Sequence, residues 1–381
     1  MHDVVVIGGG PVGLCAAVAL AGQRMRPLVL EAQAQPGPGA TRVFALSHGA
    51  RLILERLGVW PLLAEATPIR AVHVSQRGRF GHTVLRAEEL GLDALGHVVA
   101  EAELLRALRV RAYAVGVELV AGASVDAIES DLEAARVRYQ QHGIAREAPG
   151  RVVAQADGGA TLAAPGRTTA RDYGQCALSA LVRATGARAD HAYERFTGKG
   201  PIALLPFAAR HALIWTVPAD EAAALMATDD GQFVARLGQC YGERIGAVTL
   251  DGARASFPLR LRFAHRVAGE RHVLIGNAAQ TLHPVAGQGF NIGLRDAFEL
   301  ARALADCRRA GEDLVAGVQR YRALRRLDRA GGTLFTDFLV RLFSNDDPLL
   351  GAARGAGLLL LDASGPAKRF LMRRMIFGTR T

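Results

Sequence analysis

The chain begins with an apolar run and a glycine-rich turn, Asp-Val-Val-Val-Ile-Gly-Gly-Gly-Pro-Val-Gly at residues 3–13. The first five of these residues are typical of a buried strand. Gly8, Gly10 and Gly13 follow with the spacing G-x-G-x-x-G, and residues 14–22, rich in Ala and Leu, predict a helix. The stretch therefore predicts a strand, a tight turn and a helix in direct succession.

A second apolar run and an acid complete the unit. Residues 27–30 predict another strand, and Glu31 follows at its end. This order matches the fingerprint of a dinucleotide-binding βαβ unit, in which the acid accepts hydrogen bonds from a ribose. In that fingerprint Gly8 permits the turn, Gly10 admits the pyrophosphate and Gly13 allows the helix to pack on the strand. The fingerprint alone does not distinguish FAD from NAD.

A long glycine-containing stretch near the C-terminal third is the second informative region. Residues 272–275 predict a strand, and residues 297–305 predict a helix. Between them, residues 276–296 read Gly-Asn-Ala-Ala-Gln-Thr-Leu-His-Pro-Val-Ala-Gly-Gln-Gly-Phe-Asn-Ile-Gly-Leu-Arg-Asp. A glycine-rich loop before a helix start suits an anion or an electron-rich ring oxygen.

Composition describes an ordinary globular protein. Its 381 residues are 50% hydrophobic and 22% charged, which favours two or three domains. The net charge of +10 comes almost wholly from arginine, since Lys199 and Lys368 are the lysines. No dense basic run with interleaved aromatic residues occurs, so we expect no nucleic-acid partner.

The cysteines and apolar runs bear on location. The four cysteines are scattered without a CxxC pair, so we expect neither a disulfide framework nor a metal site. The chain starts directly with a predicted strand, and no apolar run reaches the roughly 18 residues of a membrane span. We expect a cytoplasmic protein, with contact to the inner face of the membrane left open.

The order of predicted elements indicates an α/β fold with a discontinuous nucleotide-binding domain. We expect this Rossmann-type domain to comprise residues 1–68, 97–170 and 263–320. A mainly antiparallel β domain that holds the substrate is expected at residues 69–96 and 171–262. Residues 321–381 predict a C-terminal helical region.

Three loops at strand ends carry a family resemblance: residues 8–13, Asp157-Gly158 and residues 276–293. In this order they resemble the FAD-dependent aromatic monooxygenases with the fold of p-hydroxybenzoate hydroxylase. Residues 283–296 are similar to the signature of the ubiquinone-biosynthesis hydroxylases. Residues 42–47, 193–197 and 200–206 are similar to that family as well. Asn277, where most of these enzymes have Asp, resembles the 2-polyprenyl-6-methoxyphenol hydroxylase branch.

The resemblance implies a cofactor, a reaction and a set of contacts. The cofactor is FAD, reduced by NAD(P)H or another electron donor, and molecular oxygen is the co-substrate. The flavin hydroperoxide then formed hydroxylates the aromatic ring of a polyprenylated phenol in ubiquinone biosynthesis. The implied FAD contacts are Gly8, Gly10, Pro11, Val12, Gly13, Glu31, Arg42, Val125, Asp157, Asn277, Pro284, Gly287, Gly289, Phe290 and Asn291.

No acid–base residue is assigned, but one loop is expected to activate the flavin. Its residues are His283, Pro284, Gly287, Gln288 and Gly289. A structural role for His283 competes with a role as a base. Many relatives place a Ser and an Arg soon after Asp-Gly; residues 159–164 contain neither, so the resemblance implies no nicotinamide contact there.

Several alternatives stay open. The chain fits a related flavoprotein hydroxylase or a prenyl reductase acting on another substrate, or a non-catalytic FAD-binding member of a ubiquinone-biosynthesis complex. Residues 358–361 and 370–372, with Lys368, Arg369, Arg373 and Arg374 beside them, fit either a helix that closes the core or a membrane-surface contact.

Overall fold

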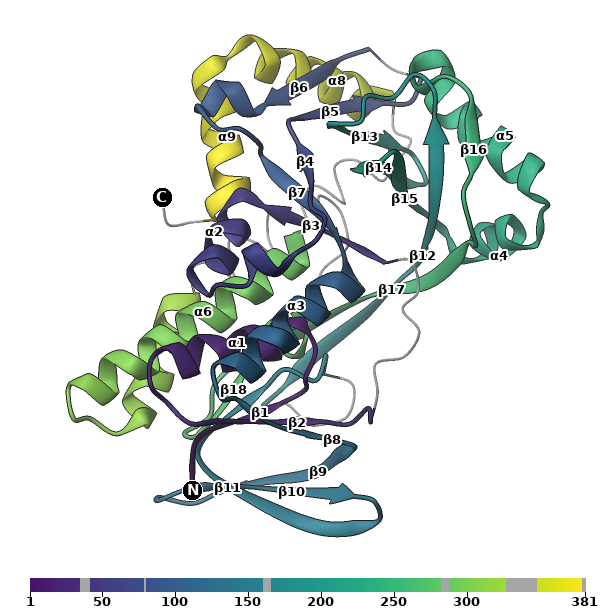
Figure 1. Cartoon of the computed structure of the whole chain (residues 1–381). Coiled ribbons are helices and arrows are strands. Elements are labelled where there is room, and N and C mark those ends of the chain that lie inside the picture. The colour runs from purple at the N-terminus through teal and green to yellow at the C-terminus, as the bar shows by residue number, and fades with distance from the viewer. Residues whose placement is uncertain (35–41, 79, 160–165, 282–287, 327–347, 379–381) are drawn as a thin grey trace.

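The computed structural model describes residues 1–34, 42–78, 80–159, 166–281, 288–326 and 348–378. The chain folds around three sheets, one of them parallel at its centre and one long and almost wholly antiparallel (Figure 1).

The first sheet contains the N-terminal strand. Its strands follow the order β8-β2-β1-β11-β10-β9, with β18 beside β11, and β8, β2, β1, β11 and β18 run parallel. Their bounds are β1 (His2–Ile7), β2 (Pro27–Glu31), β8 (Glu118–Ala121), β9 (Ala123–Ser130), β10 (Ala135–Gln141), β11 (Ile144–Gln155) and β18 (His272–Leu274).

Both faces of β1 are buried, which explains its continuous apolar run. Val4 and Val6 pack with the helices α1 (Pro11–Gly22), α3 (Glu101–Ala114) and α6 (Gln288–Arg309). Val5 and Ile7 point the other way, into a core shared with β9 and β10. Figure 1 shows the helices above the parallel part of this sheet, and its antiparallel part, formed by β9, β10 and the first half of β11, below that parallel part.

The second sheet follows the order β19-β17-β12-β15-β14-β13-β5-β6, with β16 beside β12. All its neighbouring pairs are antiparallel except β13 and β5. The bounds are β5 (Ala71–Gln76), β6 (His82–Arg86), β12 (Thr168–Ala184), β13 (His191–Thr197), β14 (Gly200–Phe207), β15 (Arg210–Pro218), β16 (Val248–Leu250), β17 (Ala255–Ala264) and β19 (Gln280–Thr281).

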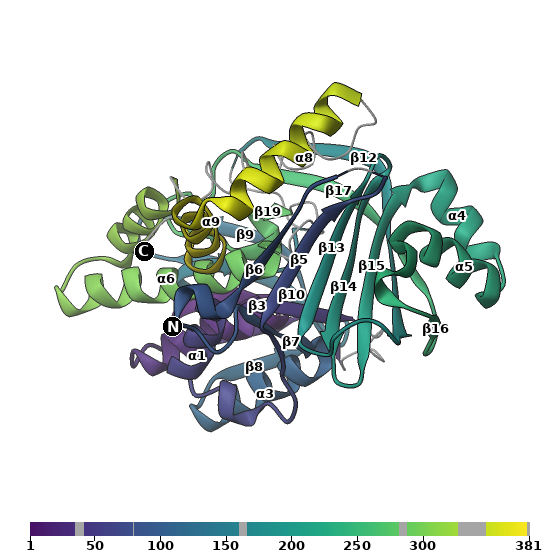
Figure 2. The same cartoon turned by 90° about the horizontal axis from the view of Figure 1, so that it is seen from above.

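The two faces of the second sheet have different neighbours. One face packs against α4 (Ala219–Ala227) and α5 (Asp230–Tyr241), which flank the sheet in Figure 2. The other face packs on the third sheet, whose strands β3 (Val43–Ser47), β7 (Gly96–Ala100) and β4 (Thr67–Ile69) pair antiparallel. This third sheet therefore lies between the large sheet and the helices of the first.

The remaining helices are short or C-terminal. They are α2 (His48–Arg56), η1 (Trp60–Leu62), η2 (Ala87–Leu90), η3 (Gly242–Ile245), η4 (Gly276–Ala278), α8 (Pro348–Ala363) and α9 (Gly365–Phe377). The yellow helices α8 and α9 pack along β6 and α2, beside the large sheet (Figure 1). Among the described residues, none of the helices is long and apolar enough to cross a membrane.

One sequence-based helix assignment needs correction. The helix expected to begin at residue 297 already begins at Gln288, so residues 289–296 are its first turns and not a loop. The helices α4 and α5 are separate because Asp229 caps the start of α5, where its carboxylate accepts a hydrogen bond from the Gln232 N–H (2.8 Å).

Candidate functional site

The three glycines of the first turn differ in whether a larger residue would fit there. Gly8 has a φ of +103°, and a Cβ there would lie 2.7 Å from the Ala156 carbonyl oxygen. A Cβ on Gly13 would lie 1.9 Å from the Gly8 carbonyl oxygen. A Cβ on Gly10 would meet no atom within 4 Å. The fold itself needs Gly8 and Gly13, whereas Gly10 leaves one side of the turn open to a ligand.

The start of α1 has the electrostatics of an anion site. Gly10 is the N-cap residue, Pro11 occupies the first turn, and no side chain caps this end. The backbone N–H groups of a first helical turn lack intrahelical partners and carry partial positive charge. An anionic group placed against Gly10 would meet these donors.

Glu31 lies at the end of β2 with its carboxylate fixed beside the turn. One carboxylate oxygen accepts a hydrogen bond from the Gly9 N–H (2.6 Å), and the other accepts one from the Gln33 N–H (2.8 Å). Each oxygen keeps a further lone pair. The structure therefore puts the predicted acid next to the predicted phosphate site.

Asp157 holds the second loop in a tight turn against the first. Its carboxylate accepts hydrogen bonds from the Gly159 N–H (2.8 Å) and from the Gln155 amide (3.1 Å). The Gln155 oxygen in turn lies 2.9 Å from Nε2 of His272, on β18. Burial lowers the pKa of His272 to about 4, against an opposing effect of Asp157, so its ring is neutral at pH 7. His272 therefore donates to the Gln155 oxygen, and the network joins β11 to β18.

The third loop meets the first at Val12. A Cβ on Gly276, where φ is +58°, would lie 3.0 Å from a Val12 methyl, and a Cβ on Gly293 would lie 2.8 Å from one. The N-terminal parts of α1 and α6 thus pack closely. Asn277, in η4, is exposed beside this contact.

The buried carboxylate of Asp296, in α6, binds both η4 and Arg325, and the sequence patterns did not reveal this. The Gly276 N–H donates to Asp296 (3.0 Å), whose other carboxylate oxygen lies 2.6 Å from Arg325. The side chains of Asp296 and Arg325 are 2% and 1% exposed. The sequence signal that could have revealed the pair is the presence of one acid and one arginine on the apolar faces of two neighbouring helical segments.

Asn291 and Phe290, at the start of α6, contact β3. The Asn291 amide donates to the Ala45 carbonyl (2.9 Å) and accepts from the Ser47 N–H (2.8 Å). The Phe290 ring stacks on Phe44 at 4.0 Å. Asn291 is therefore a bridge between α6 and β3, and its flavin contact stays a prediction.

Arg42 and Val125, two further predicted FAD contacts, lie at different sheets. Arg42 directly precedes β3, is largely exposed, lies 3.8 Å from Glu101 and stands over the Phe44 ring. The Val125 side chain, on β9, packs into the core beneath the first sheet. Of the predicted flavin loop, Gln288 and Gly289 begin α6, while His283, Pro284 and Gly287 lie outside the described residues.

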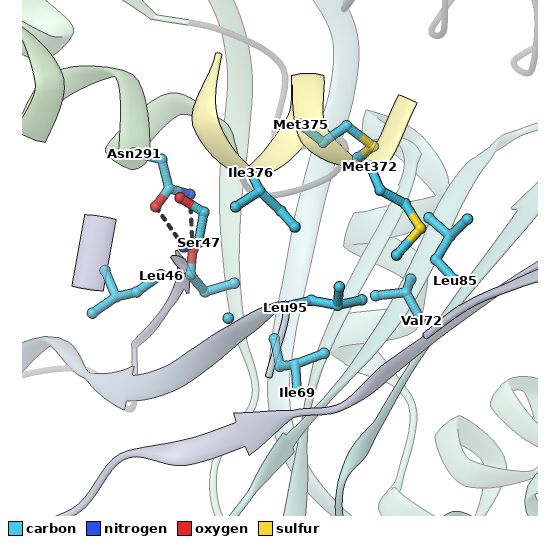
Figure 3. Close-up of a pocket in the computed structure, with 12 residues that line it drawn as sticks. Leu46, Ser47, Ile69, Val72, Leu85, Leu95, Asn291, Met372, Met375 and Ile376 are labelled. Atoms are coloured by element: carbon cyan, nitrogen blue, oxygen red, sulfur yellow. Dashed lines mark hydrogen bonds between the residues drawn. The ribbon is translucent and has the colours of Figure 1, made fainter. Parts of the chain in front are cut away.

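An apolar cavity of about 100 Å³ lies beside Asn291 (Figure 3). It lies beneath α9, between residues of β3, β4, β5, β6, α6 and the start of β7 (Figure 3). The lining residues are Ala45, Leu46, Ser47, Ile69, Val72, Leu85, Leu95, Gly96, Asn291, Met372, Met375 and Ile376. Met372 belongs to residues 370–372, for which the sequence left core packing and a membrane contact open; it is buried and lines the cavity. A cavity site was not predicted for Met375 and Ile376, because their partners lie near the other end of the chain.

Comparison with known proteins identifies the family. A family model described as an FAD binding domain matches residues 1–328. The chain belongs to this family. The ubiquinone hydroxylase UbiL of Rhodospirillum rubrum is 34% identical to it, over 97% of this chain and 88% of the relative. The 3-demethoxyubiquinol 3-hydroxylase of Escherichia coli is 29% identical, over 96% of each chain.

A solved structure shows the same fold. The p-nitrophenol 4-monooxygenase of Pseudomonas putida aligns with a TM-score of 0.82 and 19% identity, covering 100% of this chain and 99% of that one. The sequence-based assignment to the FAD-dependent aromatic monooxygenases is therefore confirmed, and FAD is the cofactor.

The outer side of this flavoprotein's C-terminal helices is partly apolar. Leu358 and Met372 point inward, at 7% and 2% exposure, whereas Leu360 and Phe370 are 70% and 73% exposed. Lys368 is buried, with its ammonium 2.9 Å from Glu89 and 3.2 Å from Asp362. The helices therefore have a core-facing side, and the expectation that Lys368 adds charge to a surface is wrong.

Proposed function

We propose that this FAD-dependent monooxygenase hydroxylates the aromatic ring of a polyprenylated phenol in ubiquinone biosynthesis. The observation that carries the proposal is an apolar cavity adjoining the nucleotide site: Asn291 lines the cavity, and Gly293, less than one turn further along α6, packs on Val12 of the phosphate turn. An apolar substrate held there would lie next to a dinucleotide bound at that turn. The names of the two relatives describe the same class of reaction.

The residues around the turn fit the parts of FAD. The open side of Gly10 and the uncapped start of α1 would hold the pyrophosphate, and Glu31 would accept hydrogen bonds from the adenosine ribose. Arg42 would add positive charge near the phosphates. Further contacts are proposed for the backbone of Val125 with adenine and for Asp157, Asn277, Gly289 and Phe290 toward the ribityl chain and flavin.

Reduced FAD, when bound, supplies the chemistry that activates molecular oxygen. One oxygen atom then enters a ring C–H bond and the other leaves as water, with two electrons from NAD(P)H or another donor. The protein orients the ring beside the flavin and excludes water there. The apolar walls around Ile69, Val72 and Leu85 suit the apolar part of the substrate next to it.

The domain division remains part of the proposal. The cofactor domain would comprise residues 1–68, 97–170 and 263–320, the substrate domain residues 69–96 and 171–262, and the helical region residues 321–381. One strand pairing does not follow this division. β19 pairs with β17 of the large sheet, although residues 280–281 belong to the cofactor domain as proposed.

Turnover with product analysis tests the function. Purified protein is incubated with NADH or NADPH, oxygen and a short-chain prenylated phenol, and products are analysed by mass spectrometry. We expect one added oxygen atom on the ring. Saturated prenyl double bonds without oxygen uptake would identify a prenyl reductase, and FAD-loaded protein without turnover on any phenol would favour a non-catalytic member of a biosynthetic complex.

We also propose that the exposed side of α8 and α9 contacts the inner face of the membrane, where such a substrate resides. Leu359, Leu360 and Phe370 are exposed there, and Arg369, Arg373 and Arg374 are exposed on α9. Apolar side chains flanked by arginines suit an interface with anionic lipids.

Liposome binding tests this surface. Replacing Arg369, Arg373 and Arg374 with Gln should weaken co-sedimentation with anionic liposomes at low salt, by about 1 kcal/mol for each arginine that reaches the surface. FAD content serves as the folding control. Equal binding by wild type and variant, or no binding by either, would contradict the membrane contact and leave substrate delivery by a partner protein.

A further inference from the structure

We propose that the cavity beneath α9 binds one isoprene unit of the substrate's side chain, and that Met372 and Met375 determine which chains it accepts. The proposal rests on the proposed function, because it assigns a site to the prenyl chain of that substrate. It concerns residues outside the nucleotide fingerprint.

The chemistry of the walls favours a hydrocarbon occupant. Ser47 and Asn291 are the polar residues among the twelve that line the cavity. The amide of Asn291 is hydrogen-bonded to the backbone of β3, and the Ser47 hydroxyl accepts a hydrogen bond from the Ala50 N–H (3.2 Å). A phenol hydroxyl buried here would find polar side chains only at Ser47 and Asn291, both already engaged with the backbone, so the loss of its hydration would be poorly compensated. An alkenyl group has no such requirement.

The size of the cavity limits the occupant. Its volume is about 100 Å³. An apolar protein cavity of roughly 150 Å³ takes a benzene ring, so this one holds about four or five carbon atoms. That corresponds to one branched isoprene unit. The rest of a longer chain must leave the cavity.

The helix that roofs the cavity also carries apolar side chains on the outer surface. Met372 and Ile376 project from α9 toward Val72, Leu85 and Leu95, and Met375 lines the cavity beside them (Figure 3). The same helix carries Phe370, which is 73% exposed. A chain that leaves past α9 would therefore reach the apolar side chains on its outer side.

Polar contacts hold α9 over the cavity at both ends. At its start, Lys368 forms the ion pairs with Glu89 and Asp362. At its end, the Phe377 carbonyl accepts a hydrogen bond from Arg295 of α6 (3.3 Å). Methionine side chains are unbranched and flexible, so Met372 and Met375 can adapt to a branched chain without displacing the helix.

Two variants on α9 test the proposal. Met375→Trp fills the cavity, and Met372→Ala enlarges it; Ala367→Trp adds the same large side chain at an exposed position of α9 as the matched control. The substrates are one phenol without a side chain, with one isoprene unit and with two units, in the absence of membranes. Both kcat/KM and the rise in unfolding temperature on binding are measured for each.

The prenyl selectivity should change in opposite directions. Each buried methylene changes binding about fourfold, so wild type should prefer the one-unit phenol over the unprenylated one by at least about tenfold. Met375→Trp should remove that preference, Met372→Ala should move it toward the two-unit chain, and Ala367→Trp should leave it unchanged. If Met375→Trp does not fold, the proposal is judged by whether Met372→Ala shifts the selectivity toward the two-unit chain.

The outcomes separate this proposal from the proposed function. Prenyl-dependent stabilisation that Met375→Trp removes, without hydroxylation of any phenol, would support the cavity assignment and contradict the hydroxylase function. Hydroxylation with the same prenyl selectivity in wild type and both cavity variants would overturn the cavity assignment alone.

Discussion

The phosphate turn and the cavity beneath α9 are built in opposite ways. In the turn, backbone meets backbone: the positions of Gly8 and Gly13 leave no room for a Cβ. In the cavity, side chains from β3 to β7, α6 and α9 meet around empty space. The turn has one allowed geometry that a short sequence can encode, whereas the cavity depends on the packing of distant segments. The following experiments test which parts of the molecule depend on local sequence and which depend on distant residues.

The largest effect is expected at the ion pair that supports the third loop, because there a local loop depends on a distant residue. Arg325→Met leaves Asp296 buried without its cation and should lower the free energy of unfolding by about 3–5 kcal/mol, measured by urea denaturation. Adding Asp296→Asn should recover part of the loss. Arg183→Met, which breaks a partly exposed pair with Asp251 and leaves that carboxylate near Arg210, is the control and should cost at most about 1 kcal/mol. A small loss in Arg325→Met would mean that the loop is self-supporting.

Gly10→Val tests whether the open side of the turn serves the cofactor. The fold has room for the side chain, so the apoprotein should remain folded, while the pyrophosphate approach is blocked and FAD affinity falls at least about 100-fold. Gly22→Val, at the other end of α1, also points into empty space and should keep FAD. Flavin absorbance after gel filtration measures both. Full occupancy in Gly10→Val would contradict the assignment of the phosphate site.

The network behind the second loop should give a pH dependence. The pKa of His272 is lowered to about 4 in the fold, from 6.5, so the unfolded state binds more protons between these values. Stability from neutral His272 is complete above pH 6.5 and is lost as the pH falls toward 4. Because His272→Gln cannot titrate, its unfolding free energy should fall less between pH 7 and 4.5 than that of wild type, by about 2 kcal/mol. Parallel pH profiles for the two proteins would refute this.

Asn277→Asp should have the smallest effect. Asn277 is exposed on η4, so an added carboxylate should be tolerated and FAD retained. The new negative charge should disfavour the reduced flavin and lower its two-electron potential by about 30 mV, a tenfold change in equilibrium. Spectroelectrochemistry measures the shift. Loss of FAD would show that Asn277 does not lie where the resemblance implies.

Much of the nucleotide site could be predicted from sequence because its geometry is local. The strand β1, the glycines, the helix α1 and Glu31 lie where the fingerprint predicts. The start of α6 could not be predicted: Gly289 and Gly293 are weak helix formers, and contacts of Gly293 with Val12 and of Asn291 with β3 outweigh that preference.

The sequence by itself determined the βαβ turn, since glycine and apolar periodicity restrict the backbone wherever they occur, and its motifs identified the family and, through the family, the cofactor. Tertiary structure alone decided that Asn291 binds β3, that Asp296 finds Arg325 and that Lys368 is buried in ion pairs. It also decided that α9 closes a cavity against strands from the other end of the chain. The physical reason is that a side chain's partner depends on strand register and helix docking, which the residues around it do not specify.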